Sequence, residues 1–136
     1  MEDVKVNVKI KLSALWAAVT LTYLYGDYWG LYMPGYLEEI ISGDSLFSSS
    51  QETLLGVAIL LVIPGLMVFL SLALKPIANR WANIILGIFF TAFVLMTLLL
   101  PGPGLYYIFL SIVEMVLTLL IVWHAWKWPT QKTSAP

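Results

Sequence analysis

The sequence predicts an all-α polytopic membrane protein, with four transmembrane helices in an up-down antiparallel bundle and both termini in the cytoplasm. Three observations lead there: the composition, four long apolar runs and a one-sided distribution of basic residues. The 136 residues are 60% hydrophobic and 11% charged, whereas ordinary soluble domains carry about 25% charged residues. A soluble domain this small cannot hide so much apolar surface. We therefore expect residues 1–136 to form a single domain in a lipid bilayer.

The four apolar runs set the predicted spans, which are residues 12–33, 52–74, 81–100 and 105–126. Helices of about 20 residues, rising ~1.5 Å per residue, cross a hydrocarbon core of ~30 Å. Continuous runs favour helices, because barrel strands are about 10 residues long and alternate in polarity. The first run is longer than the ~7–15 residues of a signal-peptide core, so we expect it to be retained.

Short connections between the runs predict antiparallel neighbours. Pro34 and Gly35 end the first run, and Ser49 to Glu52 has the spacing of a capping box for the second. Lys75–Arg80 is interpreted as a short polar connection, and Pro101–Gly104 as a tight turn.

Two further segments allow alternatives. The long outer loop, residues 34–51, contains Tyr36–Gly43, which is compatible with a short interfacial helix or with a plain loop. The N-terminal segment Val4–Lys11 alternates apolar and polar residues as a strand does. Because a lone strand has no partner, we expect a tail instead.

The basic residues predict the orientation. All of them precede the first run, separate the second from the third, or follow the fourth: Lys5, Lys9, Lys11, Lys75, Arg80, Lys127 and Lys132. The positive-inside rule places these segments, and both termini, in the cytoplasm, and the loop 34–51 outside. Tyrosines concentrate on the outer side and four of the six tryptophans on the inner side, as expected for interfacial aromatic residues.

Small residues recur every four positions in the first run: Ala14, Ala18, Thr22, Gly26 and Gly30. In lipid, helices associate through such close approaches. The ladder predicts either a contact within the chain or a homo-oligomer, for which we favour a dimer.

The fourth and the second apolar runs carry packing signals of other kinds. A second stripe follows one face of the fourth run: Tyr107, Ser111, Glu114, Thr118, Ile121 and Ala125. Its mixture of small and polar groups predicts that this face contacts protein. Pro64, within the second run, predicts a kink.

Asp27 and Glu114 are the acidic residues in the interior of the predicted spans, whereas Glu52 lies at the first position of its span. Charges in lipid are costly and normally face a bundle interior or water. Glu114 lies nine residues after Leu105, roughly 13–14 Å from the outer end, and Asp27 lies six residues before Met33, roughly 9 Å from it. The two acids are therefore expected at similar depth.

Two interpretations of these acids stay open. Adjacent carboxylates cannot both ionise easily, so the pair can hold a proton or bind a cation. Hydroxyl partners for such an ion, proton or solute site are Tyr23, Tyr28, Thr22, Ser111 and Thr118. Alternatively, each acid only bonds helices together, and Asp27 reaches the outer interface.

The inner interface has its own polar residues. We expect Asn79, Arg80, Trp81, Asn83 and His124 to anchor that side of the protein. The chain has no cysteine and one histidine, so we expect no metal site and no cofactor. It has none of the glycine-rich, nucleophile-elbow or zinc-protease motifs, which argues against an enzyme. A basic stripe for nucleic acid is also lacking.

Several stretches resemble a prokaryotic family of small four-helix membrane proteins that is catalogued only as a domain of unknown function. They are "KLSALWAAVTLTYLYGDYWGLYMPG", "IPGLMVFLSLAL", "NRWANIILG" and "IFLSIVEMVLTLLIVWHAWKWP". The resemblance spans nearly the whole chain and implies an integral protein of a bacterial or archaeal inner membrane. Its motif positions include Asp27, Pro34, Gly35, Asn79, Arg80 and Glu114.

The small multidrug-resistance transporters provide a contrast, since their proton-coupled glutamate lies in the first helix. Here the acid of the first run is Asp27, nearer the outside, which argues against membership. We expect an oligomeric carrier or channel for protons, cations or a small solute. The alternative is an accessory subunit or lipid-binding scaffold, with a protein partner at the outer loop 34–51.

Overall fold

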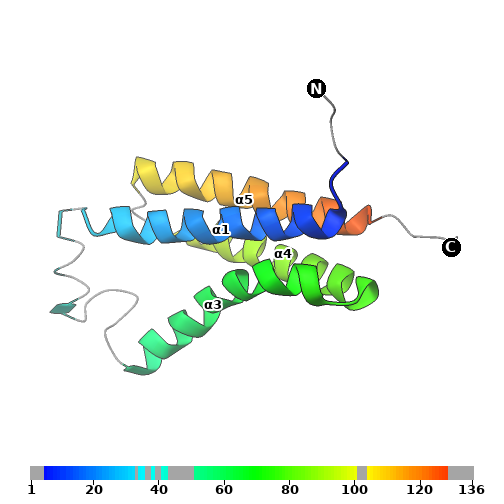
Figure 1. Cartoon of the computed structure of the whole chain (residues 1–136). Coiled ribbons are helices and arrows are strands. Elements are labelled where there is room, and N and C mark those ends of the chain that lie inside the picture. Colours follow the sequence, from blue (N-terminus) through cyan, green and yellow to red (C-terminus); the bar gives the residue numbers. More distant parts are fainter. Residues whose placement is uncertain are drawn as a thin grey trace, which may run out of the picture.

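The computed structural model describes residues 5–32, 34–35, 38, 41–42, 51–100 and 104–128. Its long helices are α1 (Val8–Gly30), α3 (Gln51–Ala73), α4 (Pro76–Leu98) and α5 (Leu105–Trp126). They alternate in direction, as an up-down bundle requires (Figure 1). α3, α4 and α5 are long and apolar enough to cross a membrane. α1 is not among them, because lysines, tyrosines and an aspartate interrupt its apolar residues.

The helix termini gather at two ends of the bundle, here called the lysine end and the acid end. The lysine end contains the start of α1, the α3–α4 turn and the end of α5 (Figure 1). The acid end contains the end of α1, the start of α3 and the α4–α5 connection. Lys5, Lys75 and Lys127 all belong to the lysine end, which agrees with the one-sided distribution found in the sequence.

α1 begins earlier than predicted. The Asn7 side chain accepts a hydrogen bond from the Lys9 backbone N–H at 2.8 Å and so caps the helix. Val8–Lys11, expected to belong to a tail, therefore forms the first turn. The alternation of apolar and polar residues misled the prediction, because a capping asparagine is a local signal independent of periodicity.

α4 also begins earlier, at Pro76 instead of Trp81. The predicted polar connection Lys75–Arg80 is therefore wrong, since most of it is helical and α3 and α4 are separated by Leu74 and Lys75 alone. Proline suits a first helical turn, where its missing N–H has no intrahelical partner to lose.

Several predictions about connections fall outside the described residues. They concern Ser49 of the capping box, most of Tyr36–Gly43 and most of Pro101–Gly104. Of the segment Tyr36–Gly43, the described residues Glu38, Ile41 and Ser42 are helical. Gly35 has φ of 81°, a left-handed conformation that suits glycine in the predicted turn after Pro34.

α1 lies at the centre of the packing, between α5 and α3, while α4 packs along α5. The core lies between these helices and is built around Trp16, which is fully buried and meets Phe90 of α4 edge to face. α4 and α5 approach closely at Gly87, where a β-carbon would lie 2.6 Å from a methyl group of Val122. A larger residue at this position would require the Val122 side chain or the two helices to shift.

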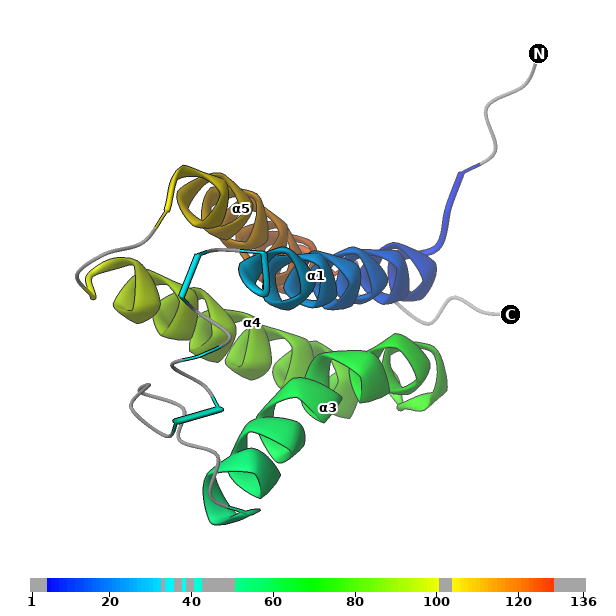
Figure 2. The ribbon, with the colours of Figure 1, turned by 90° about the vertical axis from the view of Figure 1, so that its left-hand side faces the viewer.

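α3 is held at one end only. Its later half supplies the buried residues Pro64, Met67 and Ser71. Its first half diverges from the bundle towards the acid end, and the helix changes direction partway along (Figure 2). This bend agrees with the kink predicted at Pro64, and it leaves Leu54, Leu55 and Ile59 exposed.

Candidate functional site

The buried face of α5 positions the candidate acidic site. Five residues of the predicted stripe are the buried residues of this helix: Ser111, Glu114, Thr118, Ile121 and Ala125. Their spacing of three and four residues keeps them on one side of the helix, as predicted. This side faces α1 and α4, so Glu114 points into the bundle instead of towards lipid.

The Glu114 side chain is 6% exposed. Among the hydrogen bonds of the described residues, none reaches its carboxyl oxygens. Thr118, one turn later, is committed elsewhere: its hydroxyl lies 2.6 Å from that of Thr91 and donates to the Glu114 backbone carbonyl at 3.0 Å. Thr118 therefore joins α5 to α4 and leaves the carboxyl group without a partner.

Tyr23 of α1 brings a second unpaired group to the same region. Its ring packs against Phe90, with the ring centroids 6.1 Å apart. Its hydroxyl is buried and has no hydrogen-bond partner. Glu114, Asp27 and Tyr107 are near enough to interact with this hydroxyl electrostatically.

Asp27 and Glu114 also interact electrostatically, so the predicted pair lies in one region of the molecule. Their surroundings differ, because Glu114 is buried while Asp27 is exposed on the surface of α1. The other predicted hydroxyl partners on α1 are engaged elsewhere. Tyr28 bonds to the Tyr32 hydroxyl at 3.0 Å, and Thr22 donates to the Ala18 carbonyl.

The small-residue ladder of α1 does not lie on a single packing face of the chain. Gly30 is buried, and a β-carbon on Gly26 would meet Leu110 of α5 at 3.7 Å. Ala18 and Thr22 are half-buried and Ala14 is exposed. The ladder therefore contacts α5 near the acid end and turns outwards near the lysine end.

At the lysine end, the structure contains a polar network that the sequence analysis missed. Asn83 is fully buried, and its carbonyl oxygen accepts a hydrogen bond from the Trp16 indole at 2.7 Å and another from the Ser71 hydroxyl at 3.4 Å. Its amide donates to the side-chain oxygen of Asn79 at 2.6 Å. One side chain thus connects α1, α3 and α4.

Asn79 caps the end of α3 from the start of α4. Its amide donates to the Ser71 carbonyl at 2.6 Å and to the Leu74 carbonyl at 3.4 Å. These carbonyls lie at the C-terminal end of α3, where the helix leaves such groups without intrahelical partners. Both asparagines were expected to anchor the protein at the membrane surface, and the structure buries both completely instead.

Asn79 and Asn83 are buried, and not at the surface as expected, because α4 begins earlier than predicted. When the helix begins at Pro76, five of its six buried residues follow steps of three and four: Asn79, Asn83, Gly87, Phe90 and Val94, with Ile84 as the sixth. This is the same signal that identified the buried face of α5. Placing the helix start at Trp81 excluded Asn79 from the pattern and concealed it.

Arg80 caps α5 in a similar way. Its guanidinium donates to the carbonyls of Ala125 and Trp126, both at 3.1 Å. It also lies 5.7 Å from the ring centroids of Trp81 and Trp126. A cation at a helix C-terminus is favourable because of the helix dipole, so Arg80 stabilises the α4–α5 pair.

The remaining predicted anchors lie where the sequence placed them, at the lysine end. The Trp81 side chain is 50% exposed. His124 is half-buried, with its Nδ1 atom 2.8 Å from the Leu120 carbonyl oxygen. Within the described ranges, no group of three or more His, Cys, Asp or Glu residues is arranged to hold a metal ion.

Comparison with known proteins adds a family but no activity. Neither the curated proteins nor the solved structures contain a match to the chain. A family model covers residues 2–135, nearly the full length. The resemblance noted in the sequence is thereby confirmed, and the chain belongs to a family of unknown function, DUF6326.

Proposed function

We propose that this small membrane protein binds a proton or a cation at Glu114, with Tyr23 and Asp27 beside it, and carries it across the membrane as an oligomer. The observation that carries this proposal is Glu114, a buried residue whose carboxyl group accepts no hydrogen bond within the described residues. Such a group is costly when charged and unpaired. A bound proton or cation removes that cost.

Tyr23 supports the same interpretation. A buried hydroxyl without a partner is itself unfavourable by about 1–3 kcal/mol, and this one is next to two acids. Together, Tyr23 and Glu114 supply oxygen atoms for a small cation, or a donor and an acceptor for a proton. The chain keeps both groups unpaired at one place, which a purely structural contact does not require.

Asp27 argues for a second protomer. It lies on the exposed surface of α1. An exposed carboxylate in a membrane span needs water, a headgroup or a protein partner. A homodimer through this side of α1 covers Asp27 and enlarges the narrow interior of a four-helix chain.

The proposed location follows from the lysines. Because Lys5, Lys75 and Lys127 share one end of the bundle, the positive-inside rule places this end in the cytoplasm. α1 is then the first of four spans, and the acidic site lies in the outer half of an inner, cytoplasmic membrane. We propose that the protein works without a cofactor and has no catalytic activity.

The alternative is an accessory subunit or scaffold. Its support is the first half of α3, which leaves Leu54, Leu55 and Ile59 exposed. In that case Glu114 contributes to stability only, and the loop 34–51 binds a partner protein.

Flux through proteoliposomes separates the two functions. We expect the wild-type protein to move protons or a monovalent cation, and Glu114→Gln to abolish this flux, because the amide keeps the shape but cannot ionise. Glu52→Gln is the matched control, since Glu52 is an exposed acid at the start of α3. Wild-type flux equal to that of empty liposomes, for protons, sodium and potassium, would contradict transport.

A further inference from the structure

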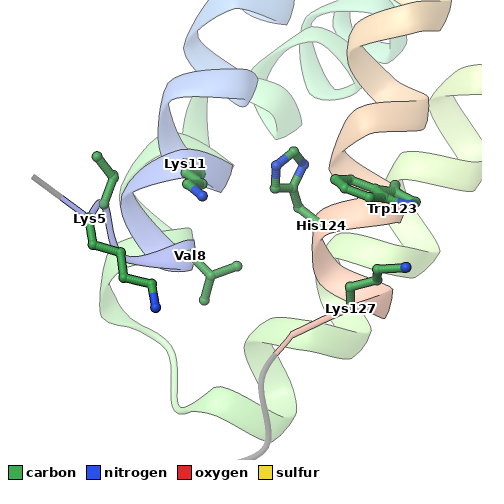
Figure 3. A pocket seen from close by; sticks show the side chains of 7 residues that line it. Lys5, Val8, Lys11, Trp123, His124 and Lys127 are labelled. Carbon is green, nitrogen blue, oxygen red and sulfur yellow. The ribbon is translucent and has the colours of Figure 1, made fainter. Parts of the chain in front are cut away.

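A pocket at the lysine end is not used by the proposed transport site. It has a volume of about 260 Å³ and lies between the start of α1 and the end of α5 (Figure 3). Lys5, Val8 and Lys11 form one side, and Trp123, His124 and Lys127 form the other. Pockets for drug-sized ligands are roughly 300–1,000 Å³, so this one suits a small group such as the head of a lipid.

The residues that line the pocket carry a net positive charge. Three lysines line it, and no carboxylate forms an ion pair with them in the part of the chain that the structure describes. Val8 and Lys11 of the first turn of α1 line the pocket, so the positive end of this helix dipole lies next to it. All of these features favour an anion.

The end of α5 does not cancel this field. Helix C-termini carry a partial negative charge on their free carbonyls. Here the carbonyls of Ala125 and Trp126 accept hydrogen bonds from Arg80, which brings a full positive charge to them. Lys127 lies over the Trp123 ring at 5.4 Å, which fixes a further cation at the rim.

The surrounding tryptophans place the pocket at headgroup level. The side chains of Trp81, Trp123 and Trp126 are 50%, 52% and 61% exposed, and all lie at the lysine end. Tryptophans gather where the hydrocarbon meets the headgroups. The pocket is therefore at the depth where the phosphates of the bilayer lie, and not in the aqueous phase.

We propose that this pocket binds a phosphate group, supplied by the headgroup of an anionic phospholipid. The lysines and the start of α1 attract the anion, and Val8 and Trp123 contact the apolar part of the lipid next to it. Basic pockets between transmembrane helices recognise lipid headgroups in this way. The proposal is independent of the acidic site, because Glu114 lies ten residues, roughly 15 Å, before His124 along α5.

The test measures binding of short-chain phosphatidylglycerol to the full chain in neutral detergent, by titration calorimetry. Each lysine near an anionic surface contributes about fivefold in affinity. We expect the double variant Lys11→Gln/Lys127→Gln to bind about 25-fold more weakly. Lys9→Gln/Lys75→Gln is the charge-matched control, because neither lysine lines the pocket, and we expect a change of less than about twofold.

A parallel titration with inorganic phosphate identifies the source of the ligand. Phosphatidylglycerol binding that only the pocket variant weakens supports a lipid. Binding of inorganic phosphate alone, with the same dependence on Lys11 and Lys127, supports the phosphate site and assigns it to a soluble anion. Equal losses in the two double variants, or binding of neither probe, overturns the proposal. Unchanged thermal unfolding of both variants excludes a folding defect.

Discussion

The lysine end and the acid end of the bundle treat buried polar groups in opposite ways. At the lysine end, the side chains of Asn79 and Asn83 are fully buried, and each makes several hydrogen bonds. At the acid end, the Glu114 carboxyl and the Tyr23 hydroxyl lie near each other without a hydrogen bond. A satisfied network stabilises one arrangement of helices, whereas unpaired groups are costly unless something binds to them.

The same contrast appears in the packing. Hydrogen bonds join the second half of α3, the start of α4 and the end of α5 at the lysine end: Asn79 and Arg80 donate theirs, and Asn83 accepts one from Ser71. Towards the acid end, α3 diverges from its neighbours (Figure 2). Hydrogen bonds thus stabilise the lysine end, whereas the acid end retains polar groups that are available to a ligand.

The strongest test of this contrast is Asn83→Leu. Leucine has a similar size but leaves the Trp16 indole, the Ser71 hydroxyl and the Asn79 side-chain oxygen with fewer partners. Since each buried group left unpaired costs about 1–3 kcal/mol, we expect the free energy of unfolding to fall by about 3 kcal/mol. Unfolding in mixed micelles with increasing denaturing detergent measures it. A loss below about 1 kcal/mol would mean that the network contributes little.

A smaller loss is expected for Gly87→Ala. The added β-carbon would lie 2.6 Å from a Val122 methyl group and 3.3 Å from the Thr118 carbonyl oxygen, so the Val122 side chain or the α4–α5 pair must shift. We expect unfolding to become easier by about 2 kcal/mol, as for other overpacked sites. Gly56→Ala is the control, because nothing lies within 4 Å of its β-carbon position. Equal effects of the two substitutions would contradict a close crossing at Gly87.

The smallest effect, and one of opposite sign, is expected at the acid end. Glu114→Met replaces the carboxyl group of a buried residue, which accepts no hydrogen bond among the described residues, by an apolar side chain of similar length. We expect the protein to gain about 1 kcal/mol in stability while losing ion flux. Stability from micelle unfolding and flux from proteoliposomes should therefore change in opposite directions. A loss of both would show that Glu114 is a structural residue.

The sequence predicted well wherever a pattern extended over a whole helix. The stripe from Tyr107 to Ala125 identified the buried face of α5, and Pro64 marked the bend in α3. Prediction failed at the starts of α1 and α4, which depend on one or two residues. Reading Pro76–Arg80 as a polar connection moved Asn79 out of its helix and to the membrane surface.

The exposure of Asp27 could not be predicted from the sequence for a different reason. Depth along a helix follows from residue counting, so the similar level of Asp27 and Glu114 was predictable. The direction in which a side chain points depends on how α1 rotates against its neighbours. Trp16 fixes that rotation through its bond to Asn83, a residue 67 positions away, and no local pattern contains this contact.

The α3–α4 turn has a consequence for biosynthesis. Asn79 bonds to carbonyls five and eight residues before it, so this hairpin can close as soon as the two helices have entered the membrane. The acidic site instead forms only after α5 has been synthesised and has packed against α1. Its residues Asp27 and Glu114 are 87 positions apart in the sequence. A chain interrupted before α5 would keep the hydrogen-bond network of Asn79 and Asn83 but would lack the proposed site at Glu114.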